Sequence, residues 1–588
     1  MSSTPHRYDH DATILDDNES ENANGTTDRI RPTAVTPGLT EWLSSFESPQ
    51  GIGSNSWVIG KQHTRSGAPM MANDPHVPLL APPVWYEMHL KGPKTHVRGV
   101  TLSGIPFPIV GETEHCAWGV TVAYTDGIDF YSYETNDGKY RYGDEYRSFD
   151  TETKTVPVAD GDDQEVTVKR TVHGPVVDHE SDGDELQEPI AVAWTGLTAT
   201  RTGEGLLNLL RSESLTEARE GLSMFDLPSL NFVYANRDGE TLYQVVGKVP
   251  IRKTDGEPVA ANRVFNGSDK AGEWPGFKPY GTSTWDENGG VIPFEEMPHE
   301  INPEYLGTAN QRIVEDESFP HYLSASYATP FRGIRLNERL DERVTSGEPI
   351  DREFMKSLQR DTHDERAAIF VPKMLAASNE IDGKAAELLE ALSDWDYHMD
   401  RDSRAALIFS RFIPHYRDVV FKPRLEEALD DRRDPEEYYG DQWVTVTLNP
   451  DSDWFPEGRP VAIQKALERT AAELEEEGWE TYGDFNTADF KHKLEQDWLA
   501  YPPIPTDGAE GSLNNFRRDT AIGSSWRQIC PMDKSDGPSE GTFPGGNNGN
   551  PMSDHYHDQL KRWADVEYTD IGLKMPDETT VTFTEDEQ

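Results

Sequence analysis

Apolar and polar residues alternate along much of the first half of the chain, a pattern typical of half-buried β-strands. Residues 85–90 (Trp-Tyr-Glu-Met-His-Leu) alternate in this way, and residues 116–121 (Cys-Ala-Trp-Gly-Val-Thr) continue the series. Residues 236–239 (Asn-Arg-Asp-Gly) join two further predicted strands, 232–235 and 241–245, and Asp-Gly supplies the positive φ that a tight hairpin needs. Short strands joined by Gly and Pro turns indicate antiparallel sheets.

Helical periodicity replaces this alternation in three segments, which are residues 203–224, 330 to about 430, and 463–477. In the last of them the apolar residues share one helix face, and Gly478 follows as a helix stop. Residues 305–310 (Tyr-Leu-Gly-Thr-Ala-Asn) instead predict a strand that ends in a polar tip. The pattern therefore mixes sheets and helices within one chain.

The charge of the chain is strongly negative, because 106 Asp and Glu residues face 55 Lys and Arg residues, for a formal net charge of −51. Such a field repels nucleic acid and anionic membranes, so neither is an expected partner. The 14 Trp, 22 Tyr and 22 Phe residues argue for a packed interior and against disorder. Acidic residues spread over the whole length fit a folded protein whose surface works in high salt, where screening weakens self-repulsion. The composition therefore predicts a halophilic protein.

The first fifty residues differ from the rest of the chain. They are rich in Asp, Asn, Ser and Thr, which predicts a mobile leader or spacer, and they lack the basic start and apolar core of a signal peptide. Two cysteines, Cys116 and Cys530, are too few for a disulfide framework or a zinc site. No apolar run approaches the length of a transmembrane helix, so membrane insertion is not expected. Taken as it stands, the sequence predicts a cytoplasmic protein in which one large α/β unit follows the leader.

Residues 51–60 (Gly-Ile-Gly-Ser-Asn-Ser-Trp-Val-Ile-Gly) hold the first candidate for chemistry. The two glycines leave the backbone before Ser54 free to take unusual torsions, and the apolar residues after it predict the start of a buried strand. A hydroxyl at the end of a stiff strand is well placed to attack the carbonyl of Gly53. Cleavage there would leave Ser54 as an N-terminal residue that carries both a nucleophile and its own amine. The alternative is an ordinary Gly/Ser turn that opens a strand.

Several further short motifs follow this stretch in a specific order. They are Ala72-Asn73-Asp74-Pro75-His76, Trp118-Gly119-Val120-Thr121 with Asp126 and Asp129 after it, His173-Gly174-Pro175-Val176, Ala309-Asn310-Gln311-Arg312, and the tail from Pro544 to Gln559. In order and spacing the motifs resemble the penicillin acylase family of N-terminal nucleophile hydrolases, in a haloarchaeal type. The resemblance runs from Ser54 to roughly Thr569 and covers the β subunit of that family.

The resemblance implies a fold and a division of the chain. The expected class is α+β, with a four-layer αββα arrangement in which two antiparallel sheets lie between helical layers. Residues 1–53 would be a spacer detached by self-cleavage between Gly53 and Ser54, as in a zymogen, and residues 54–588 would be the catalytic domain. The expected reaction is hydrolysis of a linear amide, a penicillin or a related N-acyl compound, through an acyl ester on Ser54, which suits a role in antibiotic metabolism.

The resemblance also implies roles for individual residues. Ser54 would be the nucleophile and its α-amine, with a reference pKa of ~7.7–8.0, the base. The backbone N–H of Val122 and the side-chain amide of Asn310 would stabilise the oxyanion. His76 would hold the geometry of Ser54, and Arg332 would lie near the amine and Asn310. The alternatives stay open: a structural role for Asn310, a loop histidine at position 76, and a surface salt bridge at Arg332.

A calcium site is a further implication of the resemblance. Asp126, Ile128 and Asp129 stand at the spacing of the family's calcium loop, and two carboxylates with one backbone carbonyl are suitable ligands for a structural calcium ion. A later ligand of the family falls at His321 or a neighbour. In so acidic a chain, Asp-x-x-Asp also occurs by chance.

The sequence departs from the family at its N-terminal side, because only 53 residues precede Ser54 where the family has a helical α subunit. A separate α-subunit chain is therefore a possible partner, and export is possible if an α portion that carries a signal is missing. The acyl group stays open between aromatic, aliphatic and glutaryl-like, so an acyl-homoserine lactone acylase is an alternative. Two more distant alternatives are a truncated, non-catalytic remnant that binds a partner and a conventional serine hydrolase.

Overall fold

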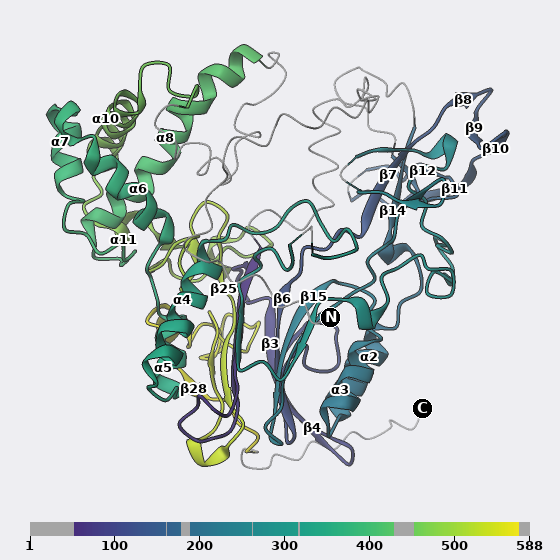
Figure 1. Cartoon of the computed structure of the whole chain (residues 1–588), viewed down its shortest axis with the longest axis horizontal. Helices are drawn as coiled ribbons and strands as arrows, with labels where there is room; N and C mark the ends of the chain where they lie inside the picture. Colours follow the sequence, from purple (N-terminus) through teal and green to yellow (C-terminus); the bar gives the residue numbers. More distant parts are fainter. Residues whose placement is uncertain are drawn as a thin grey trace.

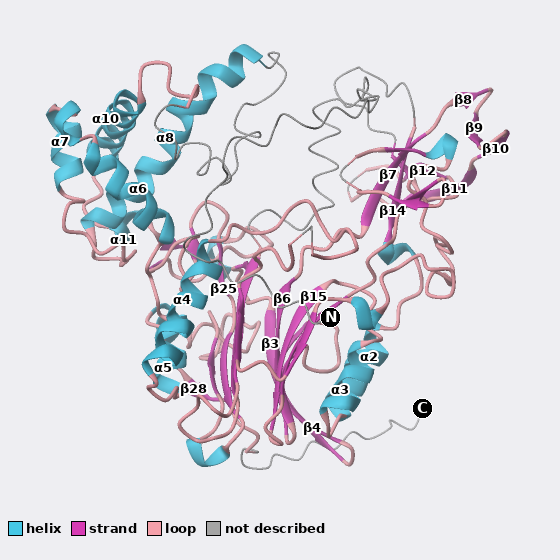
Figure 2. Cartoon of the chain, in the orientation of Figure 1, coloured by secondary structure: helices cyan, strands magenta, loops and turns pink. Residues whose placement is uncertain are grey.

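The computed structural model describes residues 52–159, 161–177, 189–261, 263–315, 318–428 and 452–574. At the centre two antiparallel sheets lie face to face, and helices cover both outer sides (Figure 1, Figure 2). In the first sheet the strand order is β21 (Tyr305–Thr308), β1 (Gly53–Ile59), β2 (Met70–Pro78), β26 (Arg527–Pro531), β27 (Glu540–Thr542) and β28 (Thr569–Asp570). Two shorter strands, β25 (Ile522–Ser524) and β24 (Phe516–Arg517), extend from β2.

The second sheet is built mostly from the segment between β2 and β21. Its order is β20 (His299–Ile301), β16 (Thr241–Val246), β15 (Leu230–Asn236), β6 (Cys116–Val122), β5 (Val110–Thr113), β4 (Thr95–Leu102) and β3 (Trp85–Gly92). The outer face of this sheet is covered by α2 (Thr202–Arg211) and α3 (Leu215–Leu222), whose Leu209 and Leu222 cluster with Val100 and Phe232 of the strands.

The side-chain alternation of β1 produces the layering. Trp57 and Ile59 pack against α4 (Phe331–Ser346) and α5 (Arg352–Gln359) on one face, whereas Val58 points to the opposite face and packs against Val233 of the second sheet. Every residue of β1 is buried as a result. The predicted four-layer αββα arrangement is thus confirmed.

Two lobes extend beyond the four layers (Figure 1). The helical lobe packs α6 (Glu365–Ala376), α7 (Gly383–Glu390), α8 (Arg404–Ala428), α10 (Arg459–Glu477) and α11 (Tyr482–Phe485) around one apolar cluster. The β-lobe contains β7 (Ile128–Ser132), β13 (Val176–Val177), β14 (Ile190–Trp194) and β19 (Phe265–Asn266), with the peripheral strands β8 (Thr135–Asn136), β9 (Lys139–Tyr142), β10 (Glu145–Ser148), β11 (Asp150–Val156) and β12 (Gln164–Arg170). Shorter elements are β17 (Lys253–Thr254), β18 (Glu257–Pro258), β22 (Thr487–Ala488), β23 (Ile504–Pro505) and α12 (Leu560–Ala564).

Most of the predicted elements are present, with shifted boundaries. The predicted hairpin forms between β15 and β16, and its Gly239 has a φ of 89°. The predicted single helix at 203–224 is instead two helices, because Ser214 accepts a hydrogen bond from Glu217 N and starts α3 afresh. The last predicted helix ends at Gly478 as expected, with a φ of 71°, but begins four residues earlier, at Arg459.

Some predictions fall outside the described residues. The leader is one, since residues 1–51 are not described, and the division into residues 1–53 and 54–588 stays a prediction. The end of the helical segment near residue 430 is another, because the described part of α8 stops at Ala428. None of the described helices combines the length and the apolar character that spanning a lipid bilayer demands.

Candidate active site

Ser54 lies near the start of β1, an inner strand between β2 and β21, and is only 3% exposed. In the antiparallel ladder Gly53 is opposite His76, and Ser54 is opposite Pro75. The Ser54 hydroxyl donates a hydrogen bond to the carbonyl oxygen of Gly53. The nucleophile proposed from the sequence is therefore in contact with the peptide group that it would cleave.

Asn310 brings a second strand end to the same place, two residues after β21. Its Oδ1 accepts hydrogen bonds from Ser54 N at 2.6 Å and from Arg332 Nη2 at 3.1 Å. Its Nδ2 donates to the carbonyl oxygen of Val122 at 2.9 Å. Asn310 has a φ of 69°, a left-handed conformation that Asn tolerates better than most residues and that clusters at functional sites. Ser54, Val122 and Asn310 are thus together, although 256 positions separate Ser54 from Asn310.

Arg332 occupies the first turn of α4 and is 1% exposed. Besides Asn310, its guanidinium donates to the Ser54 carbonyl oxygen at 2.9 Å and to Asn55 Oδ1 at 2.7 Å. Burial, together with the charge of Arg517, lowers the pKa of Arg332 to about 10, so that it is still cationic at neutral pH. The sequence alternative of a surface salt bridge is wrong, because this arginine lies against the nucleophile.

His76 is completely buried beside Gly53. Burial lowers the pKa of His76 to about 4, because the neighbouring Asp74 only partly compensates the lost hydration of the imidazolium. Nε2 lies 3.4 Å from both Asp74 Oδ2 and Asn55 Nδ2. Within the described part of the chain, Nδ1 has no hydrogen-bond partner, and a Cβ added to Gly53 would lie 3.4 Å from it. The ring is therefore neutral, and Nδ1 faces Gly53.

Sequence reasoning gave no role to three further residues near Ser54. Asn55 and Asp74 lie within motifs that were recognised, and they contact Arg332 and His76, respectively. Tyr124 donates a hydrogen bond to the carbonyl oxygen of Ile52 and has a φ of 53°. Nothing in the local pattern marks Tyr124, since its contact depends on a left-handed backbone turn after β6.

The sequence profile of penicillin amidase matches residues 7–578. The chain belongs to the penicillin amidase family. This membership makes it a hydrolase of amide carbon–nitrogen bonds, and the match begins well before Ser54.

Relatives in this family carry two kinds of name. The penicillin acylase 2 proenzyme of Pseudomonas sp. (strain SE83) is 26% identical over 579 residues, which span 93% of this chain and 70% of the proenzyme. The acyl-homoserine lactone acylase QuiP of Pseudomonas fluorescens (strain Pf0-1) is 24% identical, over 92% of this chain and 68% of its own length. The structure of a thermostable penicillin G acylase from Alcaligenes faecalis superposes with a TM-score of 0.70 at 18% identity, over 90% of this chain and all of that chain. This superposition supports the N-terminal nucleophile fold.

The residues predicted to bind calcium surround an arginine in this member of the penicillin amidase family. Asp129 and Asp126 both contact the guanidinium of Arg252, at 2.9 Å and 3.2 Å. Ile128 donates its backbone N–H to Asp126 Oδ1 at 3.3 Å, and His321 pairs with Glu296 at 2.8 Å. The described residues include no group of three or more His, Cys, Asp or Glu side chains suited to a metal ion. The calcium site stays a prediction, and the residues present do not fit it, because a cation of the protein already lies between the two carboxylates.

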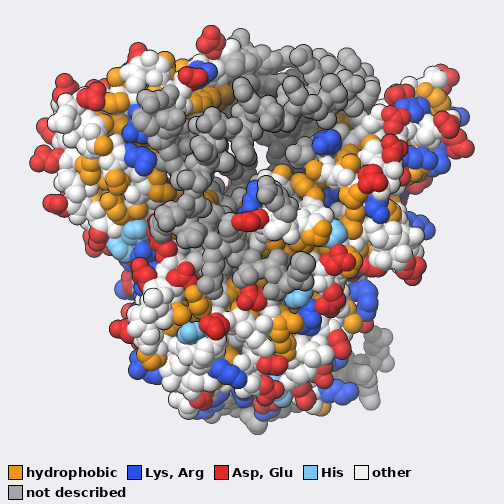
Figure 3. Space-filling view, viewed as in Figure 1, with side chains coloured by type: hydrophobic (Ala, Val, Ile, Leu, Met, Phe, Trp, Pro, Cys, Tyr) orange, Lys and Arg blue, Asp and Glu red, His pale blue; other side chains and the backbone are white. Residues whose placement is uncertain are grey.

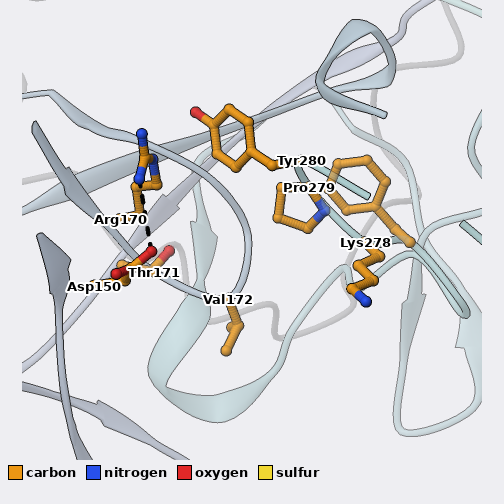
Figure 4. A pocket seen from close by; sticks show the side chains of 8 residues that line it. Asp150, Arg170, Thr171, Val172, Lys278, Pro279 and Tyr280 are labelled. Atoms are coloured by element: carbon orange, nitrogen blue, oxygen red, sulfur yellow. Dashed lines mark ion pairs between the residues drawn. The ribbon is translucent and has the colours of Figure 1, made fainter. Parts of the chain in front are cut away.

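A surface pocket of about 450 Å³ lies apart from these groups, in the β-lobe (Figure 4). Arg170 and Asp150 form an ion pair at 3.6 Å on one side of it, the Tyr280 ring lies next to Arg170 with its centre 4.8 Å from the guanidinium carbon, and Pro279 follows. None of the residues placed around Ser54 lines this pocket. The pocket is therefore separate from the group of residues around Ser54.

Proposed function

We propose that this protein matures by cutting its own chain between Gly53 and Ser54 and then hydrolyses small N-acyl amides through an acyl ester on Ser54. The observation that carries the proposal is the pair of contacts made by Ser54. Its hydroxyl contacts the Gly53 carbonyl, and its nitrogen contacts Asn310 Oδ1 at 2.6 Å. One residue thus has its oxygen at the bond to be cut and its nitrogen held where the future α-amine is needed.

Self-cleavage follows from the first contact. The Ser54 oxygen attacks the Gly53 carbonyl carbon, and the peptide C–N bond breaks as its nitrogen takes up a proton. The product is an ester between Gly53 and the Ser54 oxygen, with a free amine on Ser54. Water then hydrolyses the ester and leaves a Gly53 carboxylate and a Ser54 hydroxyl. Because Gly53 is packed against Arg332, Asn310 and His76, the attacked group is held in one position.

Hydrolysis of a foreign amide uses the same atoms. The Ser54 amine accepts the hydroxyl proton while the oxygen attacks the substrate carbonyl, and the proton then goes to the leaving amine. The positive charge of Arg332 shares the Asn310 acceptor with this nitrogen, so it disfavours protonation of the amine. Asn310 Nδ2 lies 2.9 Å from the Val122 carbonyl oxygen, so this side-chain amide is next to the Val122 backbone. We therefore propose that Asn310 Nδ2 and the Val122 N–H donate together to the oxyanion. Water finally cleaves the acyl ester.

The acyl group is proposed from the relatives, which are named for penicillin and for acyl-homoserine lactone. The test is a panel of phenylacetyl, phenoxyacetyl, glutaryl and decanoyl amides, including a decanoyl-homoserine lactone, with the released amine detected directly. Amine release by the wild type and none by Ser54→Ala supports the proposal. Release that persists in Ser54→Ala would contradict it. Activity that appears only on co-expression with a helical second chain would support a separate α subunit.

We further propose that the protein is adapted to high salt. Acidic side chains are scattered over the described part of the face seen in Figure 3, with no large basic area among them. Carboxylates at this density repel each other unless salt screens them. Circular dichroism after dialysis from molar KCl into dilute buffer should show loss of structure, and an unchanged spectrum would contradict the halophilic assignment.

A further inference from the structure

Arg252 lies within a cage of oxygen atoms in the interior of the protein. Its Nε donates to Asp129 Oδ2 at 2.9 Å, and its Nη2 donates to the backbone carbonyl of Asp126 at 2.8 Å and lies 3.2 Å from Asp126 Oδ1. Its Nη1 donates to the Pro250 carbonyl oxygen at 3.1 Å. Carboxylate and backbone carbonyl oxygens are the ligands that Ca²⁺ prefers in proteins. Here all of them bind a guanidinium.

The cage is buried, and its surroundings favour a permanent positive charge on Arg252. Arg252 is 1% exposed and Asp129 is also 1% exposed. The aromatic rings of Trp274 and Tyr322 each lie 5.7 Å from the guanidinium carbon, and Trp274 Nε1 donates to Asp129 Oδ2 at 2.5 Å. A buried carboxylate without a cation is very unfavourable, so the charge of Arg252 stabilises the folded state.

We propose that the Arg252 guanidinium takes the structural place of a bound divalent cation, so that this enzyme holds its Asp126–Asp129 segment without calcium. The guanidinium is covalently part of the chain and remains charged at any physiological pH. Its Nε and Nη2 donate to the two oxygens of the Asp129 carboxylate. A calcium ion on the same oxygens would lie beside the guanidinium, and the repulsion between the two positive charges disfavours that arrangement. Arg252 follows β16 of the second sheet and lies 123 positions from Asp129, which belongs to β7 of the β-lobe. Their contact therefore joins the β-lobe to the end of the second sheet.

The segment held in this way leads directly to the active site. Val122 ends β6, Tyr124 follows it and contacts Ile52, and Asp126 is then anchored by Arg252 and by the Leu323 carbonyl, which accepts from Asp126 N at 2.8 Å. Arg252 is therefore a positioning residue for the turn beside Ser54. Its replacement frees a cage with two carboxylates and two carbonyl oxygens, which is a site that calcium can fill.

The experiment compares the wild type with Arg252→Ala by thermal unfolding in molar KCl, with EDTA or with about 10 mM CaCl₂, together with metal analysis after desalting. The wild type should hold no calcium and show the same Tm in both conditions. Arg252→Ala should lose several degrees in Tm with EDTA and regain about half of the loss or more with calcium, but not with MgCl₂ at the same concentration. Arg98→Ala is the matched control, since Arg98 pairs with the single carboxylate of Glu87, and calcium should not restore its Tm.

Two results would overturn the proposal. One is a wild type that carries a calcium ion and loses Tm with EDTA, which would restore the calcium prediction made from the sequence. The other is an Arg252→Ala protein that neither binds calcium nor gains stability from it. If Arg252→Ala does not fold without calcium, its soluble yield after refolding with and without calcium gives the same comparison. A yield that calcium does not raise counts against the proposal. The calcium content and Tm of the wild type test the proposal independently of this variant.

Discussion

The replacement of Asn310 by Asp separates the two jobs proposed for this side chain. The carboxylate keeps an oxygen that accepts from Ser54 N at 2.6 Å and from Arg332 at 3.1 Å. It loses the Nδ2 donor, which in the wild type lies 2.9 Å from the Val122 carbonyl oxygen. Asn310→Asp therefore keeps the amine in place while it removes one proposed oxyanion donor.

The expected size of the effect follows from these contacts. Loss of one oxyanion donor lowers kcat by ~10²–10³, or about 3 kcal/mol of transition-state stabilisation. In Asn310→Asp a carboxylate oxygen faces the Val122 carbonyl oxygen in place of the Nδ2 donor. A buried acceptor left without a donor costs about 1–3 kcal/mol of folding stability. The new negative charge also raises the pKa of the Ser54 amine, so the acidic limb of the pH–rate profile should move to higher pH.

Asn231→Asp is the matched control, because Asn231 is also a buried amide on the same carbonyl. Its Nδ2 donates to Val122 O at 3.2 Å and its Oδ1 accepts from Tyr243, but it does not contact Ser54. Both variants should lose comparable stability, while only Asn310→Asp should lose kcat by two or more orders of magnitude. The assay is kcat with a chromogenic N-acyl anilide on fully processed protein, at the pH optimum of each variant. A wild-type kcat in Asn310→Asp, or an equal loss in Asn231→Asp, would refute the reasoning.

Three further predictions concern the groups around Gly53. Gly53→Val should block chain cleavage on a denaturing gel, because even a Cβ would lie 2.9 Å from Arg332 Nη2; a normally processed variant would contradict the packing argument. Arg332→Gln should shift the acidic limb of the kcat/KM profile to higher pH, since the charge that disfavours protonation of the Ser54 amine is gone, and Arg332→Lys should shift it less. His76 should destabilise the protein in acid: its folded-state pKa of about 4 lies below the unfolded value of 6.5, so only the unfolded chain binds the proton between them. Stability should then fall by up to about 3 kcal/mol as pH drops through this range, and urea titrations of His76→Gln should show a smaller fall; an equal fall would reject the assignment.

Much of the fold was predictable because its strand-forming runs are short and are bounded by Gly, Pro or Asp-Gly turns. Residues 232–245 gave the hairpin of β15 and β16 from the Asp-Gly turn, and β1 follows from its apolar run. The break between α2 and α3 was missed because a serine cap competes with a helical period that continues across it. A single serine such as Ser214 does not stand out in the sequence when the helical apolar pattern continues on both sides of it.

The site divides in a similar way. Ser54 can be found from its own surroundings, but Asn310 and Arg332 were identified through the order of motifs, since they come to Ser54 from 256 and 278 positions away. Arg252 was missed for the same reason. No spacing rule connects Arg252 to Asp126 and Asp129. From the sequence alone, this pair of carboxylates is equally consistent with a metal site and with an ion pair to a distant arginine.

The most direct test of the central claim is the N-terminal residue of active protein. Wild-type chain purified in high salt should yield, by intact mass and terminal sequencing, a fragment that begins at Ser54, and this fragment should account for all amide hydrolysis. Ser54→Ala should remain uncut and inactive. Active material without a chain that starts at Ser54 would contradict the account, and an uncut, inactive wild type would favour a non-catalytic remnant of the family.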